Sequence, residues 1–217
     1  FSGGDFTLSC WAKIPNGTSS KKILDKWTVH SGEGGWFMYV SSDGKLRTRM
    51  EDGGGTNNAT EDGVGDYIVF NGSTSIDTDK WVFLTITFDA DGDITLYVDG
   101  VNDGSNSNAS ALGSIDTSYD LYIGMNQSAQ EEFIGNISEV AIYNAALSAS
   151  QVATLYNGRE PYNHREGIAS GNLQGWWRMG DGKFDMQKHE RGASYIDNSD
   201  VKNYIVSNES ATPTLSN

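Results

Sequence analysis

The sequence is poor in the residues that cross-link, kink or anchor a chain: it holds one cysteine, three prolines and no long apolar run. Because Cys10 has no second cysteine to pair with, no disulfide can form within the chain, and packing alone must stabilise the fold. The longest hydrophobic stretches are only a few residues, whereas a membrane-spanning helix needs about 20 apolar residues. We therefore expect no spanning segment and no membrane partner.

Basic residues are scarce relative to acidic ones. Fifteen Lys and Arg against 29 Asp and Glu give a formal net charge of −14. A field of this sign repels phosphate backbones, which excludes nucleic acid as a partner. The acids have two interpretations: they keep a surface protein soluble, or some of them bind cations such as calcium.

Glycine and aromatic residues, in contrast, are abundant. Twenty-six glycines disfavour a helical protein, since glycine inside a helix costs about 1 kcal/mol relative to alanine. Short alternating runs of apolar and polar residues predict many strands, with Asp-Gly turns at 43–44, 91–92 and 99–100. The predicted strands cover residues 6–12, 22–27, 36–40, 46–50, 67–70, 81–88, 94–98, 119–124, 133–143, 173–179 and 204–206. Strands and turns at this spacing indicate a sandwich or a barrel.

Three local patterns add detail. In the first predicted strand Phe6, Leu8 and Cys10 lie on one face, so Cys10 is expected to be a small buried hydrophobe. Residues 51–66 are rich in glycine, asparagine and acids and are predicted to form a mobile loop. One helix is predicted at 148–156, with Ser148 as N-cap and Gln151 at the spacing of a capping box. We expect this helix to cover the open end of the sandwich.

Several segments, in this order and spacing, resemble the laminin-G-like (concanavalin A-like lectin/glucanase) domain, in the variant found in bacterial and marine phage surface proteins. The segments that carry the resemblance are 6–12, 80–89, 94–100, 121–124 and 133–148. The resemblance implies an all-β fold: an antiparallel, jelly-roll-like sandwich of two sheets with one short helix and an extended C-terminal tail. We accordingly divide the chain into a sandwich, 1–158, and a linker with a tail, 159–217.

The run Trp176-Trp177-Arg178 departs from this family pattern. It resembles the opening strand of the same domain, yet it follows the domain, within the predicted strand 173–179. Three explanations stay open: the tail fills the missing position in its own sandwich, it inserts into a neighbouring copy by strand addition, or it begins a truncated second repeat. Because the run also resembles structural proteins of marine phages, we assign Trp176, Trp177 and Arg178 to assembly.

Aromatic and arginine residues on neighbouring predicted strands suggest a carbohydrate-binding patch. Its predicted members are Trp36, Tyr39, Arg47 and Arg49, with Trp27 beside them. Aromatic faces pack on sugar rings, and arginine supplies forked hydrogen-bond donors. The alternative is that the aromatic residues belong to the core.

The resemblance also implies a structural calcium on the rim of the sandwich, for which Asp5 and Glu139 are the candidate ligands. The alternative is that both are solvated acids. The acid-rich turn at 89–93 does not fit an EF-hand, because Gly92 and Gly100 fall at the wrong loop positions.

No catalytic constellation is recognisable. Glycosidases need two carboxylates facing one cleft, and the nearest candidate strand, 137–142, carries only Glu139. His30, His164 and His189 are scattered and lack the spacing of metal ligands. We therefore predict that the chain is not an enzyme.

Three functions remain in competition. The first is a structural or decorating protein on the surface of a phage virion, which holds other chains through its tail and sheet edges and forms an oligomer or a larger assembly. The second is a lectin module of a bacterial cell-surface or secreted protein, which binds glycans. The third is a glycoside hydrolase or lyase on the same fold.

Overall fold

The computed structural model describes residues 4–27, 34–53, 67–129, 131–179 and 201–202. The strands are β1 Phe6–Lys13, β2 Lys21–Lys26, β3 Gly35–Val40, β4 Lys45–Glu51, β5 Tyr67–Ser75, β6 Trp81–Phe88, β7 Ile94–Val98, β8 Val101–Asn106, β9 Leu121–Ile123, β10 Asn136–Tyr143, β11 Leu173–Trp177 and β12 Val201–Lys202. The helices are α1 Ala149–Tyr156 and the 3₁₀ turns η1 Ala109–Ala111, η2 Asn157–Arg159 and η3 Ser170–Asn172. The predicted strand 204–206, most of the predicted loop 51–66, His30 and His189 lie outside the described residues.

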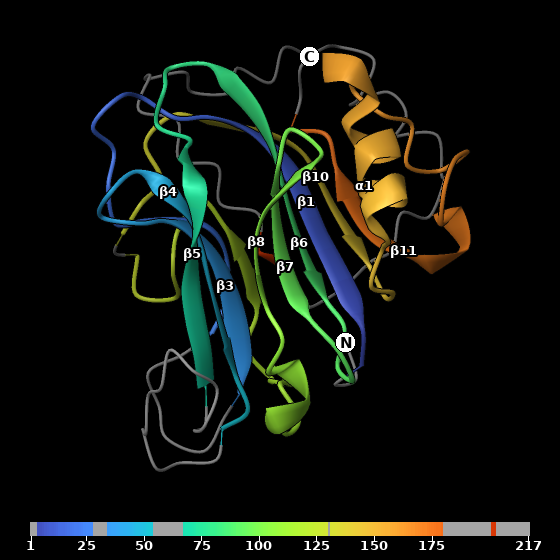
Figure 1. Ribbon diagram of the computed structural model, residues 1–217. Helices are drawn as coiled ribbons and strands as arrows, with labels where there is room; N and C mark the ends of the chain where they lie inside the picture. Colours follow the sequence, from blue (N-terminus) through green and yellow to red (C-terminus); the bar gives the residue numbers. More distant parts are fainter. Residues whose placement is uncertain (1–3, 28–33, 54–66, 130, 180–200, 203–217) are drawn as a thin grey trace, which may run out of the picture.

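The strands form two sheets packed face to face, which confirms the predicted all-β sandwich (Figure 1). Sheet A has the order β11-β10-β1-β6-β7-β8. Sheet B has the order β12-β9-β2-β3-β4-β5; its strands pair antiparallel except for the two-residue β12, which runs parallel to β9. Antiparallel pairing between sequence neighbours is what tight Asp-Gly turns allow.

The main core lies between the sheets. It takes alternate residues from each strand, because successive side chains of a strand point to opposite faces. Phe6, Leu8 and Cys10 of β1 are all buried in it, as predicted, and the Cys10 sulfur lies 3.8 Å from the Met38 sulfur of sheet B. Burial raises the pKa of the Cys10 thiol to about 12, so this cysteine behaves as a hydrophobe.

The hairpins at the three Asp-Gly turns are confirmed, and the last of them leads into β8, a strand that the sequence pattern did not predict. Its residue Asp103 joins the open edges of the two sheets. The Asp103 carboxylate accepts hydrogen bonds from the backbone N–H and hydroxyl groups of both Ser73 and Thr74 on β5, at 2.5–3.1 Å. β8 is polar because it is an edge strand, and this is why alternation did not reveal it.

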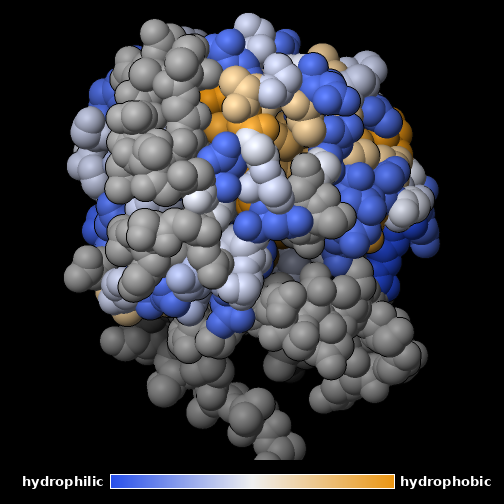
Figure 2. All heavy atoms as spheres, turned by 90° about the horizontal axis from the view of Figure 1, so that it is seen from below, coloured by the Kyte–Doolittle hydropathy of each residue, from blue (hydrophilic) through white to orange (hydrophobic). Residues whose placement is uncertain are grey.

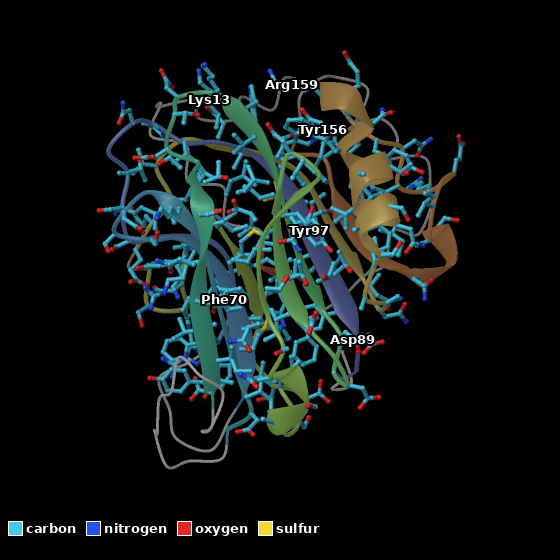
Figure 3. The ribbon with its side chains drawn as sticks, in the orientation of Figure 1. Lys13, Phe70, Asp89, Tyr97, Tyr156 and Arg159 are labelled. Carbon is cyan, nitrogen blue, oxygen red and sulfur yellow. The ribbon has the colours of Figure 1, made fainter. Side chains whose placement is uncertain are left out.

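The predicted helix is confirmed, with both hydrogen bonds of the Ser148–Gln151 capping box. It packs on the outer face of sheet A, however, rather than over the open end of the sandwich, so that part of the prediction is wrong. The reason is a second cluster on that face, in which Trp11, Phe83 and Tyr97 meet Val152 and Leu155 of the helix. Figure 3 shows Tyr97 on sheet A and Tyr156 near the end of α1.

Among the described residues, no helix has both the length and the apolar character needed to cross a bilayer. Seen from below (Figure 2), the described surface is largely hydrophilic, with hydrophobic residues mainly in the upper half of the view. Large exposed hydrophobic side chains are few in the described part of the chain: Trp81, Val101 and Ile134.

Candidate functional site

The outer face of sheet B concentrates aromatic and charged side chains. On β3 and β4 the inward positions are filled by core residues such as Met38, Leu46 and Met50, so the intervening residues point away from the core. With neighbouring strands they form a surface that we call the aromatic–cationic face. Its members are Lys22, Asp25, Trp27, Phe37, Tyr39, Arg47, Arg49, Glu51, Tyr67 and Asn71.

Strand register arranges these residues in rows across the sheet. One row runs Lys22, Tyr39, Arg47, Asn71; the next runs Asp25, Phe37, Arg49, Val69. In the third row Glu51 pairs with Tyr67 on one side and with Gly35 on the other. Because directly opposite residues on neighbouring strands have Cβ atoms about 5 Å apart, each of the first two rows forms a continuous strip of side chains.

Gly35 is the small residue that lets an aromatic ring cross this third row. Its φ is +147°, and a Cβ there would lie 2.3 Å from the Lys26 carbonyl oxygen. With no side chain on β3 at this point, Trp27 donates a hydrogen bond from its indole Nε1 to Glu51 on the next strand. The Trp27 ring also meets Phe37 edge-on, at 5.9 Å between centroids.

Arg49 is held by its own neighbours. Its guanidinium carbon lies 3.5 Å from the Tyr67 ring centroid and 5.0 Å from that of Trp27. Its Nη2 lies 2.9 Å from Glu51 Oε2, and its Nε donates to the same oxygen at 3.0 Å. Both partners of this ion pair are largely buried, so Arg49 serves to fix the aromatic rings around it.

Lys22 is similarly enclosed. Its ammonium lies 3.2 Å from the centroid of Phe37 and 5.3 Å from that of Tyr39, and its Nζ is 3.1 Å from Asp25 Oδ2. Glu131 is a second acidic neighbour, at 3.8 Å. Burial lowers the pKa of Lys22 and raises that of Asp25 to about 6, because desolvation disfavours both charged forms.

Arg47 differs from these two cations. It is half-buried between Tyr39 and Asn71 in the strand register, and it makes no ion pair or hydrogen bond to any residue that the structure describes. The next cation along the same strand, Lys45, is paired with Asp43 at 3.1 Å. Within the described part of the chain, Arg47 therefore presents a guanidinium without a paired acid, beside the ring of Tyr39.

The structure brings together Tyr39, Arg47 and Arg49 of the predicted patch, with Trp27. It corrects the fourth member: Trp36 is 2% exposed and packs in the core against Phe6. Trp36 and Tyr39 are three residues apart on one strand, so they point to opposite faces, and alternation alone would have excluded one of them. The same reasoning would have found Phe37, which the sequence analysis missed.

The two predicted calcium ligands do not share a site. The exposed Asp5 accepts a hydrogen bond from the Ala90 N–H, whereas Glu139 lies opposite the interval between Ser9 and Trp11, roughly 15 Å further along the sheet. No cluster of three or more acidic, histidine or cysteine residues suited to a metal occurs among the described residues. Asp5 and Glu139 therefore do not fit a common calcium site.

Glu139 instead binds side chains of the C-terminal strand and the residue that follows it. It sits in a β-bulge with a φ of +52° and is 1% exposed. Its carboxylate accepts hydrogen bonds from Trp176 Nε1 at 2.7 Å and Arg178 Nε at 3.1 Å. The bulge turns this carboxylate toward β11 and so ties the C-terminal strand to the sheet.

Trp176, Trp177 and Arg178, which we assigned to assembly, stabilise the chain's own sandwich in this structure. β11 pairs antiparallel with β10 at the edge of sheet A. Trp177 packs toward the main core, while Trp176 joins the cluster beneath α1. Of the three explanations for this strand, the structure shows the one in which it lies in its own sandwich.

A buried histidine completes the cluster on that side. His164 is 1% exposed, hydrogen-bonds through Nδ1 with the Tyr143 hydroxyl, and meets the Trp176 and Tyr162 rings edge-on. Burial lowers its pKa to about 4, so His164 is neutral near pH 7.

Comparison with known proteins places this geometry in a family. A model of the concanavalin A-like lectin/glucanases superfamily matches residues 1–153. Botulinum neurotoxin type E of Clostridium butyricum is 25% identical over 169 residues, which is 73% of this chain but only 12% of the neurotoxin. The match therefore concerns one small part of that protein.

Solved structures show the same fold. The binding domain of Paraclostridial Mosquitocidal Protein 1 superposes with a TM-score of 0.53 at 24% identity, covering 73% of this chain and 38% of that one. A putative carbohydrate binding protein from Bacteroides ovatus superposes with a TM-score of 0.57 at 15% identity, covering 82% and 46%. At these identities the likeness concerns the fold.

Proposed function

The chain belongs to the concanavalin A-like lectin/glucanases superfamily, and from that premise we propose that it is a non-catalytic module that binds carbohydrate on its aromatic–cationic face. The observation that carries the proposal is the row structure of that face. Tyr39, Trp27 and Tyr67 are half-buried rings on one face of sheet B. Arg49 lies against the Trp27 and Tyr67 rings, and Arg47 offers donors beside Tyr39.

This arrangement suits sugar rings for a physical reason. The apolar face of a sugar ring packs on an aromatic ring, while its hydroxyl groups need hydrogen-bond partners at the edge. Rings that are held by neighbouring ion-paired cations lose little conformational freedom when a ligand binds, which favours affinity. On the outer face of sheet A, in contrast, α1 covers the aromatic cluster of Trp11, Phe83 and Tyr97 (Figure 1).

The carboxylates of the described residues support binding rather than hydrolysis. Glu139, the one acid in the segment 137–142, is buried and accepts hydrogen bonds from Trp176 and Arg178. On the other sheet, Asp25 and Glu51 are each bound to a cation of the same face. Each of these three acids is therefore already engaged by groups of the chain itself, whereas a glycosidase needs two carboxylates that face the substrate.

The names of related proteins agree with a binding role. One neighbour is described as a binding domain and another as a putative carbohydrate binding protein. We accordingly propose that the chain lies outside the cell or on the surface of a virion. Assembly into a phage virion stays a prediction; the run expected to bind other chains lies in the edge strand of this chain's own sheet.

A printed glycan array tests the proposal with the full chain and two variants. We expect the wild-type chain to bind a defined set of oligosaccharides, and Tyr39→Ala to weaken that binding at least about tenfold through loss of the stacking ring. Trp81→Ala is the matched control, since Trp81 is an exposed aromatic residue on sheet A. Absence of binding to any glycan, or equal loss in both variants, would refute the proposal.

A further inference from the structure

The charges on the aromatic–cationic face are balanced pair by pair, with one exception. Lys22 is paired with Asp25 and Glu131, and Arg49 with Glu51. Arg47 has no such partner among the described residues.

An arginine without an acidic partner among the residues that the structure describes is unexpected in so acidic a chain. The chain has 29 acidic and 15 basic residues, so it has more than enough acids to pair with every cation. Yet Arg47 lies between the uncharged side chains of Tyr39 and Asn71, and Asn71 directs its own amide to Asp43 at 3.4 Å. A half-buried guanidinium without an anion has given up part of its hydration and gains strongly when an anion binds.

We propose that the saccharide bound by this face is acidic, and that Arg47 binds its carboxylate or sulfate group while the ring beside that group packs on Tyr39. The inference rests on the proposed function and names its ligand class. Guanidinium presents two parallel N–H donors that match a carboxylate or sulfate, so a bidentate contact selects an acidic sugar over its neutral counterpart.

The neighbouring groups favour Arg47 over Arg49 as the residue that selects an acidic sugar. Arg49 already donates to Glu51 and stacks on Tyr67, so a ligand would have to break an existing ion pair to use it. The overall charge of −14 repels acidic polymers at long range, which means that binding has to come from a local contact.

The test uses an array that carries galacturonate oligomers beside galactose oligomers of the same length, and sulfated dextran oligomers beside unsulfated ones. The two pairs distinguish a carboxylate from a sulfate as the group that is recognised. We expect the full chain to bind the acidic member of at least one pair about tenfold or more tightly than the neutral member. Arg47→Gln should abolish that preference, and Arg47→Lys should retain part of it, because it keeps the charge but loses the fork.

Lys45→Gln is the matched control. It also removes one positive charge from the same strand, but Lys45 is already paired with Asp43. Loss of acidic preference in Arg47→Gln together with its retention in Lys45→Gln supports the inference. Binding restricted to neutral sugars, or an acidic preference that survives Arg47→Gln, overturns the inference while leaving carbohydrate binding in place. Absence of binding to every sugar, neutral sugars included, overturns the proposed function itself.

Discussion

Acidification should weaken the fold through His164, and the structure sets the size of the effect. The ring is enclosed by Tyr143, Tyr162 and Trp176, and burial lowers its pKa from 6.5 to about 4. An unfolded chain therefore binds a proton at this histidine near pH 6.5, whereas the folded chain resists protonation until about pH 4. The stability that neutral His164 contributes is complete above pH 6.5 and is lost as the pH falls toward 4.

From these two pKa values, the free energy of unfolding should fall by about 2 kcal/mol between roughly pH 7.5 and pH 5 through His164 alone. Asp25 acts in the opposite direction: its pKa is raised to about 6, so its contribution is largest below pH 3.8 and is lost as the pH rises through 6. The wild-type pH profile contains both effects, and a variant is needed to isolate the contribution of His164.

His164→Gln removes the titrating ring while leaving an amide that can still hydrogen-bond with the Tyr143 hydroxyl. Urea unfolding followed by tryptophan fluorescence gives the unfolding free energy of each chain at the two pH values. We expect the variant to be less stable than the wild type near pH 7.5, and that difference to shrink by about 2 kcal/mol near pH 5. An unchanged difference would refute the assignment of a buried, neutral histidine.

Two further predictions concern stability and reactivity. Asp103→Ala should lower the free energy of unfolding by about 2 kcal/mol, because four hydrogen bonds from Ser73 and Thr74 lose their acceptor. Asp103→Asn should lower it by less. Equal stability of the wild type and both variants in urea would contradict the role of Asp103 as a link between the sheets. Cys10 should resist thiol reagents near pH 8 in the folded chain and react once denaturant is added, since burial raises its pKa to about 12. Rapid labelling of the folded chain would show that Cys10 is accessible.

Local pattern was a reliable guide to local structure. The strand alternation, the three Asp-Gly turns and the capping box of Ser148 and Gln151 each depend on residues only a few positions apart, and all three reappear in the structure. The candidate site was recovered only in part. Alternation applied strictly would have replaced Trp36 by Phe37, but it could not have shown that Lys22 and Asp25 join the same face through register.

The sequence by itself determined the class of fold, because side-chain alternation and turn chemistry act within a single hairpin. Only the tertiary structure decided which face is covered and which groups are paired. The place of α1 over sheet A, the turn of Glu139 toward Arg178, and the position of Arg47 between Tyr39 and Asn71 all depend on how separate strands pair and pack. Such contacts follow from strand order and register, which local patterns leave open until the two sheets pack together.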